Sequence, residues 1–177
     1  ITVRANYLSE ALDDAISVLK DPRLAYVSRY ALGRDYHKVL RGKLRQLARK
    51  LNDKIGHFGY RAFTDSAPIL ERALARNSGL GWIGKHTNLI NKSDGSMFFL
   101  GEIFTDLPLD TTAGFKKNHC GTCVSCIDVC PTKAIISPYK LDATKCISYL
   151  TIESKDAIPT ELRTSIGNRI FGCDDCQ

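Results

Sequence analysis

Seven cysteines are the residues of this chain with the most recognisable chemistry, and all of them lie in its last third. The first four form a run in which two residues separate each of the first three, and three residues precede the fourth, which a proline follows directly. This spacing is typical of bacterial ferredoxins, in which three thiolates hold one iron–sulfur cluster and the fourth binds another. We therefore predict two [4Fe-4S] clusters. The expected iron ligands are Cys120, Cys123, Cys126, Cys130, Cys146, Cys173 and Cys176.

A structural zinc site is the alternative for these thiols, but such sites usually combine two separate Cys-x-x-Cys knuckles. The cysteine count adds a constraint. If Cys130 belongs to a second cluster, the three later cysteines complete that cluster and the first keeps only three ligands. The near-symmetry of the two halves places the missing ligand three residues beyond Gln177, so we expect a truncated chain. An open iron or a non-protein ligand are the alternatives.

The compartment follows from the same cysteines. A secreted disulfide scaffold spreads its cysteines and pairs them evenly, whereas this chain clusters an odd number. No apolar run approaches the roughly 18 residues that a membrane span needs. No basic segment followed by an apolar one opens the chain as a signal peptide would. We expect a cytoplasmic protein that does not contact a membrane.

Positive charge is concentrated at the other end of the chain. The net charge is +6, and residues 1–64 hold 13 Lys and Arg against 6 Asp and Glu. Such a surplus suits an anionic partner, nucleic acid being the commonest. A solvated helix face is the alternative explanation.

The elements that position these residues follow from hydrophobic periodicity. In residues 35–55 apolar side chains recur every three or four residues, as on one helix face, and Lys and Arg occupy the other. Strand and helix patterns alternate, so residues 1–110 are expected to form an α+β or α/β domain, followed by a ferredoxin-like domain over 111–177. The expected elements are a strand at 1–8, helices at 10–20, 35–55 and 67–77, strands at 60–64, 88–91 and 97–104, a glycine-rich loop at 79–84 and a linker at 105–119.

Six stretches of this sequence carry a resemblance to one known family, and together they sample nearly the whole chain. The stretches are SRYALGRDYH (28–37), DSAPILER (65–72), GLGWIGKH (79–86), FFLGE (98–102), CISYLTIE (146–153) and GNRIFGCDDCQ (167–177). They resemble the epoxyqueuosine reductase family.

The resemblance implies a cobalamin-dependent reductase that carries two [4Fe-4S] clusters. Such an enzyme reduces epoxyqueuosine to queuosine at the wobble position of tRNA, the last step of queuosine synthesis. Residues 1–110 would be the cobalamin-binding domain, lacking an N-terminal part. The implied partners are the tRNA anticodon loop carrying epoxyqueuosine and an external low-potential electron donor, and the implied state is a monomer.

The resemblance also implies residue roles. Cobalamin would bind with its lower base displaced, and the glycines of residues 79–84 would let the backbone approach this large flat ligand. His86 is as readily a structural histidine as a cofactor contact, and His37 is expected to be structural or solvated. The implied cofactor-binding residues are Arg29, Tyr30, Asp65, Lys85, His86, Ser148, Cys173 and Asp174.

Asp65 is the implied catalytic residue, because opening the epoxide requires a proton for its oxygen. A general acid at neutral pH needs a raised pKa, which burial against cofactor and substrate would provide. The alternative is that Asp65 or Ser66 caps the helix expected at 67–77.

Three other functions compete with this one. A cobamide enzyme like the reductive dehalogenases would share the cofactors but lack affinity for tRNA. A ferredoxin-type electron carrier would hold clusters but no corrinoid. A zinc-stabilised RNA-binding module would be colourless.

Overall fold

The computed structural model describes residues 1–8, 12–115 and 117–177. They form two compact units, each assembled from segments that are separate in the sequence. Unit 1 comprises residues 1–7, 33–83 and 89–118, and unit 2 comprises 8–32, 84–88 and 119–177. The sequence predicted a single domain boundary after residue 110, whereas each unit contains segments from both sides of that boundary. The predicted role of residues 1–110 in binding cobalamin stays a prediction.

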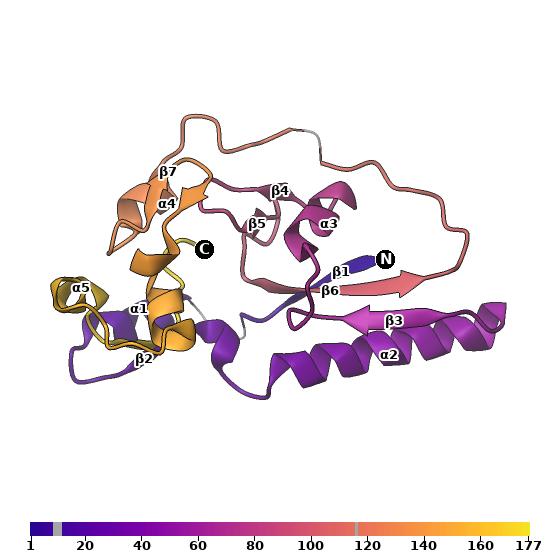
Figure 1. Ribbon diagram of the computed structural model, residues 1–177, viewed down its shortest axis with the longest axis horizontal. Coiled ribbons are helices and arrows are strands. Elements are labelled where there is room, and N and C mark those ends of the chain that lie inside the picture. Colours follow the sequence, from indigo (N-terminus) through magenta and orange to yellow (C-terminus); the bar gives the residue numbers. More distant parts are fainter. Residues whose placement is uncertain (9–11, 116) are drawn as a thin grey trace. The chain divides into compact units, whose positions relative to one another are not determined.

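Unit 1 is built on a three-stranded antiparallel sheet with helices on both faces (Figure 1). The strand order is β1 (Thr2–Asn6), β6 (Phe98–Thr105), β3 (Tyr60–Phe63). Side chains of β6 alternate between the two faces of the sheet. Ile103 packs with α2 (Tyr36–Ile55) on one face, and Phe98 packs with α3 (Glu71–Asn77) on the other. Because both pairings are antiparallel, the layer is α+β, one of the two arrangements that the sequence left open.

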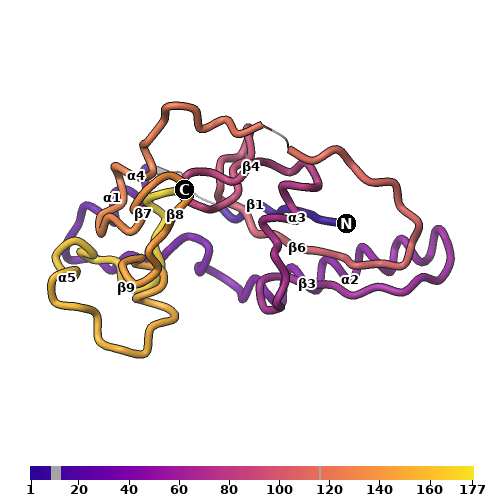
Figure 2. The backbone as a smooth tube through the Cα atoms, turned by 45° about the horizontal axis from the view of Figure 1, so that its top comes forward, coloured from indigo at the N-terminus to yellow at the C-terminus, as the bar shows by residue number. Residues whose placement is uncertain are grey.

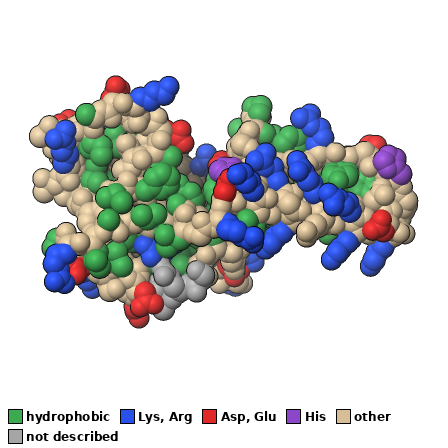
Figure 3. Space-filling model, turned by 90° about the horizontal axis from the view of Figure 1, so that it is seen from below, with side chains coloured by type: hydrophobic (Ala, Val, Ile, Leu, Met, Phe, Trp, Pro, Cys, Tyr) green, Lys and Arg blue, Asp and Glu red, His purple; other side chains and the backbone are tan. Residues whose placement is uncertain are grey.

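Helix α2 confirms the helix expected at 35–55. Asp35 caps it by accepting a hydrogen bond from the backbone N of His37 at 3.0 Å, and Gly56 ends it with φ at 91°. Its buried side chains reach so close to β6 that a Cβ on Gly101 would lie 3.0 Å from Leu44 Cδ1. Lys and Arg side chains gather over this helix in Figure 3.

Helix α3 begins at Glu71, four residues later than the sequence indicated. Pro68 disfavours helical backbone in the residue before it, and residues 64–69 form tight turns instead. Leu70 occupies the N-cap position without any side-chain hydrogen bond. The alternative that Asp65 or Ser66 caps this helix is therefore wrong.

A short hairpin completes unit 1. Strand β4 (Trp82–Ile83) pairs antiparallel with β5 (Leu89–Ile90). A Cβ on Gly81 would lie 2.1 Å from the carbonyl oxygen of Ile90, so only glycine fits there. The close approach at Gly81 is to the chain's own backbone, which corrects the expectation that this glycine makes room for a ligand.

Unit 2 joins the cysteine-containing end of the chain to an early segment (Figure 2). Strand β2 (Tyr26–Val27) pairs in parallel with β9 (Arg169–Phe171), a pairing that sequence reasoning missed because more than 140 residues separate the partners. The Asn168 side chain strengthens the join by donating to three carbonyl oxygens between residues 18 and 24.

The other elements of unit 2 are short, and two apolar clusters centred on Ala134 and Leu150 pack them. The start of the helix expected at 10–20 lies outside the described residues. No helix in the described part of the chain is long and apolar enough to cross a membrane. The elements are α1 (Leu12–Lys20), a 3-10 turn (Arg29–Ala31), α4 (Ser125–Val129), β7 (Ile135–Ser137), β8 (Lys140–Leu141), a 3-10 turn (Ala143–Lys145), a π-helical turn (Tyr149–Glu153) and α5 (Thr160–Ile166).

Candidate functional site

The cysteines of unit 2 are all free thiols, and four of them share one apolar cluster. Cys130 is buried there beside Ala134, whose backbone N donates to its sulfur at 3.3 Å. Burial, together with the nearby thiols of Cys146 and Cys130, raises the pKa of the Cys176 thiol to about 12. Three of the four thiols expected to hold the second cluster are therefore neighbours. The four members of the cluster are Cys126, Cys130, Cys146 and Cys176.

The fourth expected ligand of that cluster, Cys173, packs instead against Ile147, Leu150 and Ile166. Its thiol donates to Asp175 at 2.8 Å and lies near enough to Cys176 for the two charges to interact. Among the described residues no three metal-binding side chains converge on a point that would hold a single ion. A [4Fe-4S] cluster places one thiolate on each iron, so its ligands need not converge in that way.

The first three cysteines lie on a turn that a buried lysine holds. Lys85, 8% exposed, donates from Nζ to the carbonyl oxygens of Gly121 at 2.7 Å and Cys123 at 2.8 Å. Its own carbonyl accepts a hydrogen bond from the backbone N of Tyr139 at 2.9 Å. Lys85, which the resemblance makes a cofactor contact, therefore also fixes the cysteine-containing turn through these two hydrogen bonds, which we call the Lys85 clamp.

Asp174 anchors an early segment of the chain beside the last cysteines. Its buried carboxylate accepts hydrogen bonds from the Tyr26 hydroxyl at 2.7 Å, the Ser28 hydroxyl at 2.5 Å and the backbone N of Arg29 at 2.7 Å. Gly172 permits this packing, because a Cβ there would lie 2.5 Å from the Cβ of Ser28. Tyr26 and Ser28 were missed by sequence reasoning, which had no signal that they meet Asp174.

Unit 2 contains all but one of the residues expected to bind cofactor; the exception, Asp65, is in unit 1. His86 is buried, and its Nδ1 accepts from the backbone N of Asn88 at 2.9 Å. Cofactor binding by these residues stays a prediction. The residues in unit 2 are Arg29, Tyr30, Lys85, His86, Ser148, Cys173 and Asp174.

Asp65 lies in the turn after β3 with its side chain 60% exposed and its φ at 56°, a left-handed conformation that is uncommon outside glycine. The Tyr36 hydroxyl donates to its Oδ2, and the Nε2 of His37 lies 3.2 Å from the same oxygen. The other ring nitrogen of His37 lies 3.0 Å from Asp35. Sequence reasoning gave neither Tyr36 nor His37 a role with Asp65. The only local signal was an Asp-Tyr-His sequence opening a helix.

A pair of carboxyl groups, those of Glu71 and Glu102, lies next to the Asp65 turn. The backbone N of Asp65 donates to Glu71 Oε1 at 2.5 Å, and the Glu71 and Glu102 side chains interact. Glu102, on β6, is 1% exposed, and neither of its oxygens has a hydrogen-bond partner of ordinary geometry among the described residues. Burial, followed by the charge of Glu71, raises the pKa of Glu102 to about 8. Burial therefore favours the protonated form of Glu102.

Comparison with known proteins finds a match for each end of this chain. The family model "Epoxyqueuosine reductase QueG, DUF1730" matches residues 1–66, and the model "4Fe-4S double cluster binding domain" matches residues 119–177. The latter confirms the expected double-cluster domain. The epoxyqueuosine reductases of Xanthomonas campestris and Pseudomonas aeruginosa are 60% and 58% identical over the whole chain.

Solved structures agree with the sequence matches. An epoxyqueuosine reductase bound to an epoxyqueuosine-modified tRNA-Tyr stem loop has a TM-score of 0.84 and 34% identity over 99% of this chain. The Bacillus subtilis enzyme, with its aspartate-bearing catalytic loop swung out of the active site, has a TM-score of 0.82 and 35% identity. Each match covers 46% of those chains, and this chain spans about half the length of the curated relatives. Over its whole length, the chain is therefore similar to about half of an epoxyqueuosine reductase.

Proposed function

We propose that this chain forms the catalytic half of an enzyme that reduces epoxyqueuosine to queuosine in tRNA. The observation that carries the proposal is the Asp65 carboxylate, which is exposed, hydrogen-bonded and held in a strained turn, in a chain that also has a double-cluster domain. An exposed side chain is accessible to a bound substrate, so it can transfer a proton to that substrate. The similarity over nearly the whole chain to an epoxyqueuosine reductase solved with an epoxyqueuosine-modified tRNA stem loop supports tRNA as the substrate class.

The reaction consumes two electrons and two protons, converts the epoxide to an alkene and releases its oxygen as water. Asp65 gives the proton that the opening epoxide oxygen requires. The Tyr36 hydroxyl then stabilises the carboxylate left behind, because it already donates to Oδ2. His37 lies between Asp65 and Asp35, so it passes a replacement proton from solvent to Asp65.

The seven cysteines would hold the two clusters as thiolate ligands. When bound, the clusters would supply electrons from an external low-potential donor. The Lys85 clamp holds the turn that carries the first ligands. Hydrogen bonds with Ser125, and to a smaller extent the positive charge of Lys85, lower the pKa of the Cys123 thiol and favour the thiolate form that binds iron.

The surface next to Cys173 fits a flat cofactor. The Tyr30 and Phe171 rings lie 6.4 Å apart between centroids, and Phe171 and Ile170 are exposed. Bound cobalamin would supply low-valent cobalt as the reductant of the epoxide carbon. The residues that would hold it are Arg29, Tyr30, Lys85, His86, Ser148, Cys173 and Asp174.

Anaerobic turnover tests the proposal. The protein is reconstituted with iron, sulfide and cobalamin, then mixed with a reductant and tRNA that contains epoxyqueuosine, and digested nucleosides are analysed by mass spectrometry. We expect queuosine to form with the loss of one oxygen. Iron–sulfur absorption without a base-off corrinoid spectrum and without queuosine would instead support an electron carrier.

A further inference from the structure

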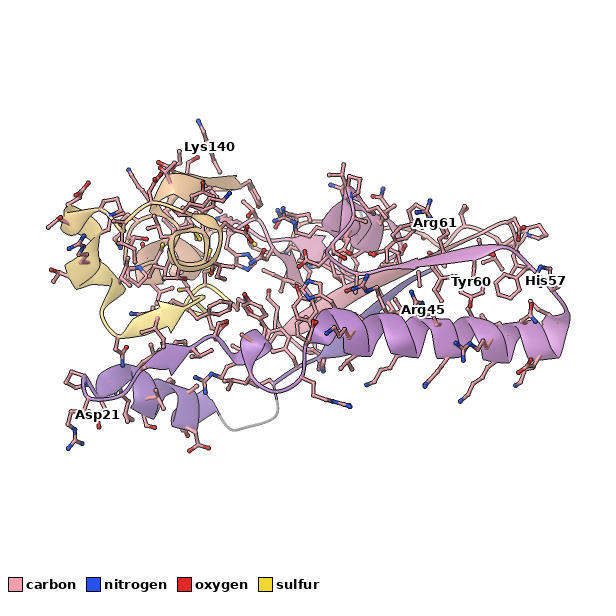
Figure 4. The ribbon with its side chains drawn as sticks, turned by 60° about the horizontal axis from the view of Figure 1, so that its bottom comes forward. Asp21, Arg45, His57, Tyr60, Arg61 and Lys140 are labelled. Carbon is pink, nitrogen blue, oxygen red and sulfur yellow. The ribbon has the colours of Figure 1, made fainter. Side chains whose placement is uncertain are left out.

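A basic hollow lies between α2 and the edge strand β3 of unit 1. Its volume is about 660 Å³. Figure 4 labels Arg45 on α2 and Tyr60 and Arg61 on β3, three of the residues that face this hollow. The lining residues are Arg41, Arg45, Tyr60, Arg61, Ala62, Phe63, Thr64, Ser66, Ala67 and Pro68. We call it the arginine cavity.

The charges of the arginine cavity are not neutralised from within the described part of the protein. No Asp or Glu lines it, and neither Arg45 nor Arg61 is within ion-pair distance of a described carboxylate. Arg41 donates from Nε to the carbonyl oxygen of His37 at 3.1 Å, which leaves its charge uncompensated. Like charges four residues apart on a helix repel each other. A bound anion would relieve that repulsion.

The arginine cavity adjoins the turn that carries the candidate acid. Ser66, Ala67 and Pro68 line it, and they follow Asp65 directly in the chain. A ligand held here therefore lies along the same turn as the Asp65 carboxylate. Tyr60 adds an aromatic ring, which suits a nucleic acid because bases and sugars pack on such rings.

We propose that the arginine cavity binds the sugar–phosphate backbone of the RNA substrate, next to the nucleotide presented to Asp65. This inference rests on the proposed function and adds a location for the RNA that the family resemblance leaves unassigned. Guanidinium groups bind phosphate oxygens in pairs, and three of them around one hollow suit one or two phosphates. Single-stranded loops expose such phosphates while their bases are splayed outward.

Binding of a fluorescent anticodon stem–loop RNA to the cluster-loaded protein tests the location. Fluorescence anisotropy is recorded at several salt concentrations for wild type, Arg45→Gln, Arg61→Gln and Lys54→Gln. We expect each arginine variant to weaken binding about tenfold. Each should also lower the slope of log affinity against log salt by roughly 0.7. Lys54 is on the same helix outside the arginine cavity, so its variant is the matched control. Arginine variants that behave like Lys54→Gln would overturn the proposal.

A second measurement identifies the contact. Neutral methylphosphonate linkages are placed one at a time in the RNA loop. At one position wild type should lose affinity, whereas Arg45→Gln should lose no more, because the partner charge is already absent. Additive losses at every position would overturn the proposal, as would equal competition by inorganic phosphate or a free mononucleotide. Weakened binding with no turnover by wild type would refute the proposed function alone, and unchanged binding with normal turnover would refute this inference alone.

Discussion

The first four cysteines of unit 2 follow one another at short, regular spacings, whereas the groups around Asp65 come from separate elements of unit 1. Asp65 follows β3, Tyr36 and His37 begin α2, Glu71 begins α3 and Glu102 lies on β6. The segment that carries the first four cysteines is a local structure, so these four ligands are close in sequence. A general acid needs a tuned environment, which distant residues can provide. The first kind of site can be recognised from spacing, and the second requires the fold.

The largest loss of iron content and turnover should come from replacing one of the cysteines. Cys130→Ser removes a buried sulfur that packs among other cysteines, so we expect the iron–sulfur absorption to fall and turnover to be abolished. Iron analysis and the visible spectrum measure the loss. Ser137→Ala, at an exposed position of β7, is the control and should retain both cofactors. Full iron content in Cys130→Ser would exclude this residue as a ligand.

Replacing the Asp65 carboxyl group should sharply reduce turnover while leaving the cofactors bound. Asp65→Asn keeps the shape of the side chain but cannot donate a proton as a carboxylic acid does, so we expect turnover to fall by about 10²–10⁴-fold. Asp110→Asn, in the exposed segment after β6, should leave turnover unchanged. Iron content and the corrinoid spectrum should match wild type in both variants. Normal turnover by Asp65→Asn would rule out the proton-donor role.

His37→Gln sharpens the comparison, since it tests a partner that only the structure revealed. Glutamine can still form a hydrogen bond to Asp65 but cannot relay a proton, so kcat should fall about tenfold with KM for tRNA unchanged. His57→Gln, at an exposed histidine beyond α2, is the matched control. A rise in KM with unchanged kcat would instead make His37 a binding residue.

Glu102→Gln should have the smallest effect on turnover but change the pH dependence of stability. The folded pKa of Glu102, about 8, exceeds the ordinary value of 4.5. Wild type should therefore lose stability as pH rises between those values, because only the unfolded chain ionises freely there. The variant should be more stable than wild type by roughly 1–2 kcal/mol at pH 8, or about 3–6 °C in Tm. Thermal melts at pH 5, 7 and 9 measure this, and parallel profiles would contradict it.

Expectations based on local patterns were largely confirmed in unit 1. The periodic apolar residues predicted α2 to within one residue, and alternation predicted β1, β3 and β6. Helix α3 was extended too far because Pro68 resembles a first-turn proline, while the turn hydrogen bonds around Asp65 oppose helix there. The parallel pairing of β2 with β9 has no local signature, so it could not be anticipated.

By itself, the sequence determined the double-cluster domain, the long basic helix and the family. These depend on spacing, periodicity and matching strings, which are properties of short segments. Only the tertiary structure decided that Asp174 secures Ser28, that Glu102 lies buried beside Glu71, and that Asp65 meets Tyr36 and His37 rather than capping a helix. The physical reason is that burial and hydrogen-bond partners, which set the pKa and orientation of a side chain, come from residues far away in the chain.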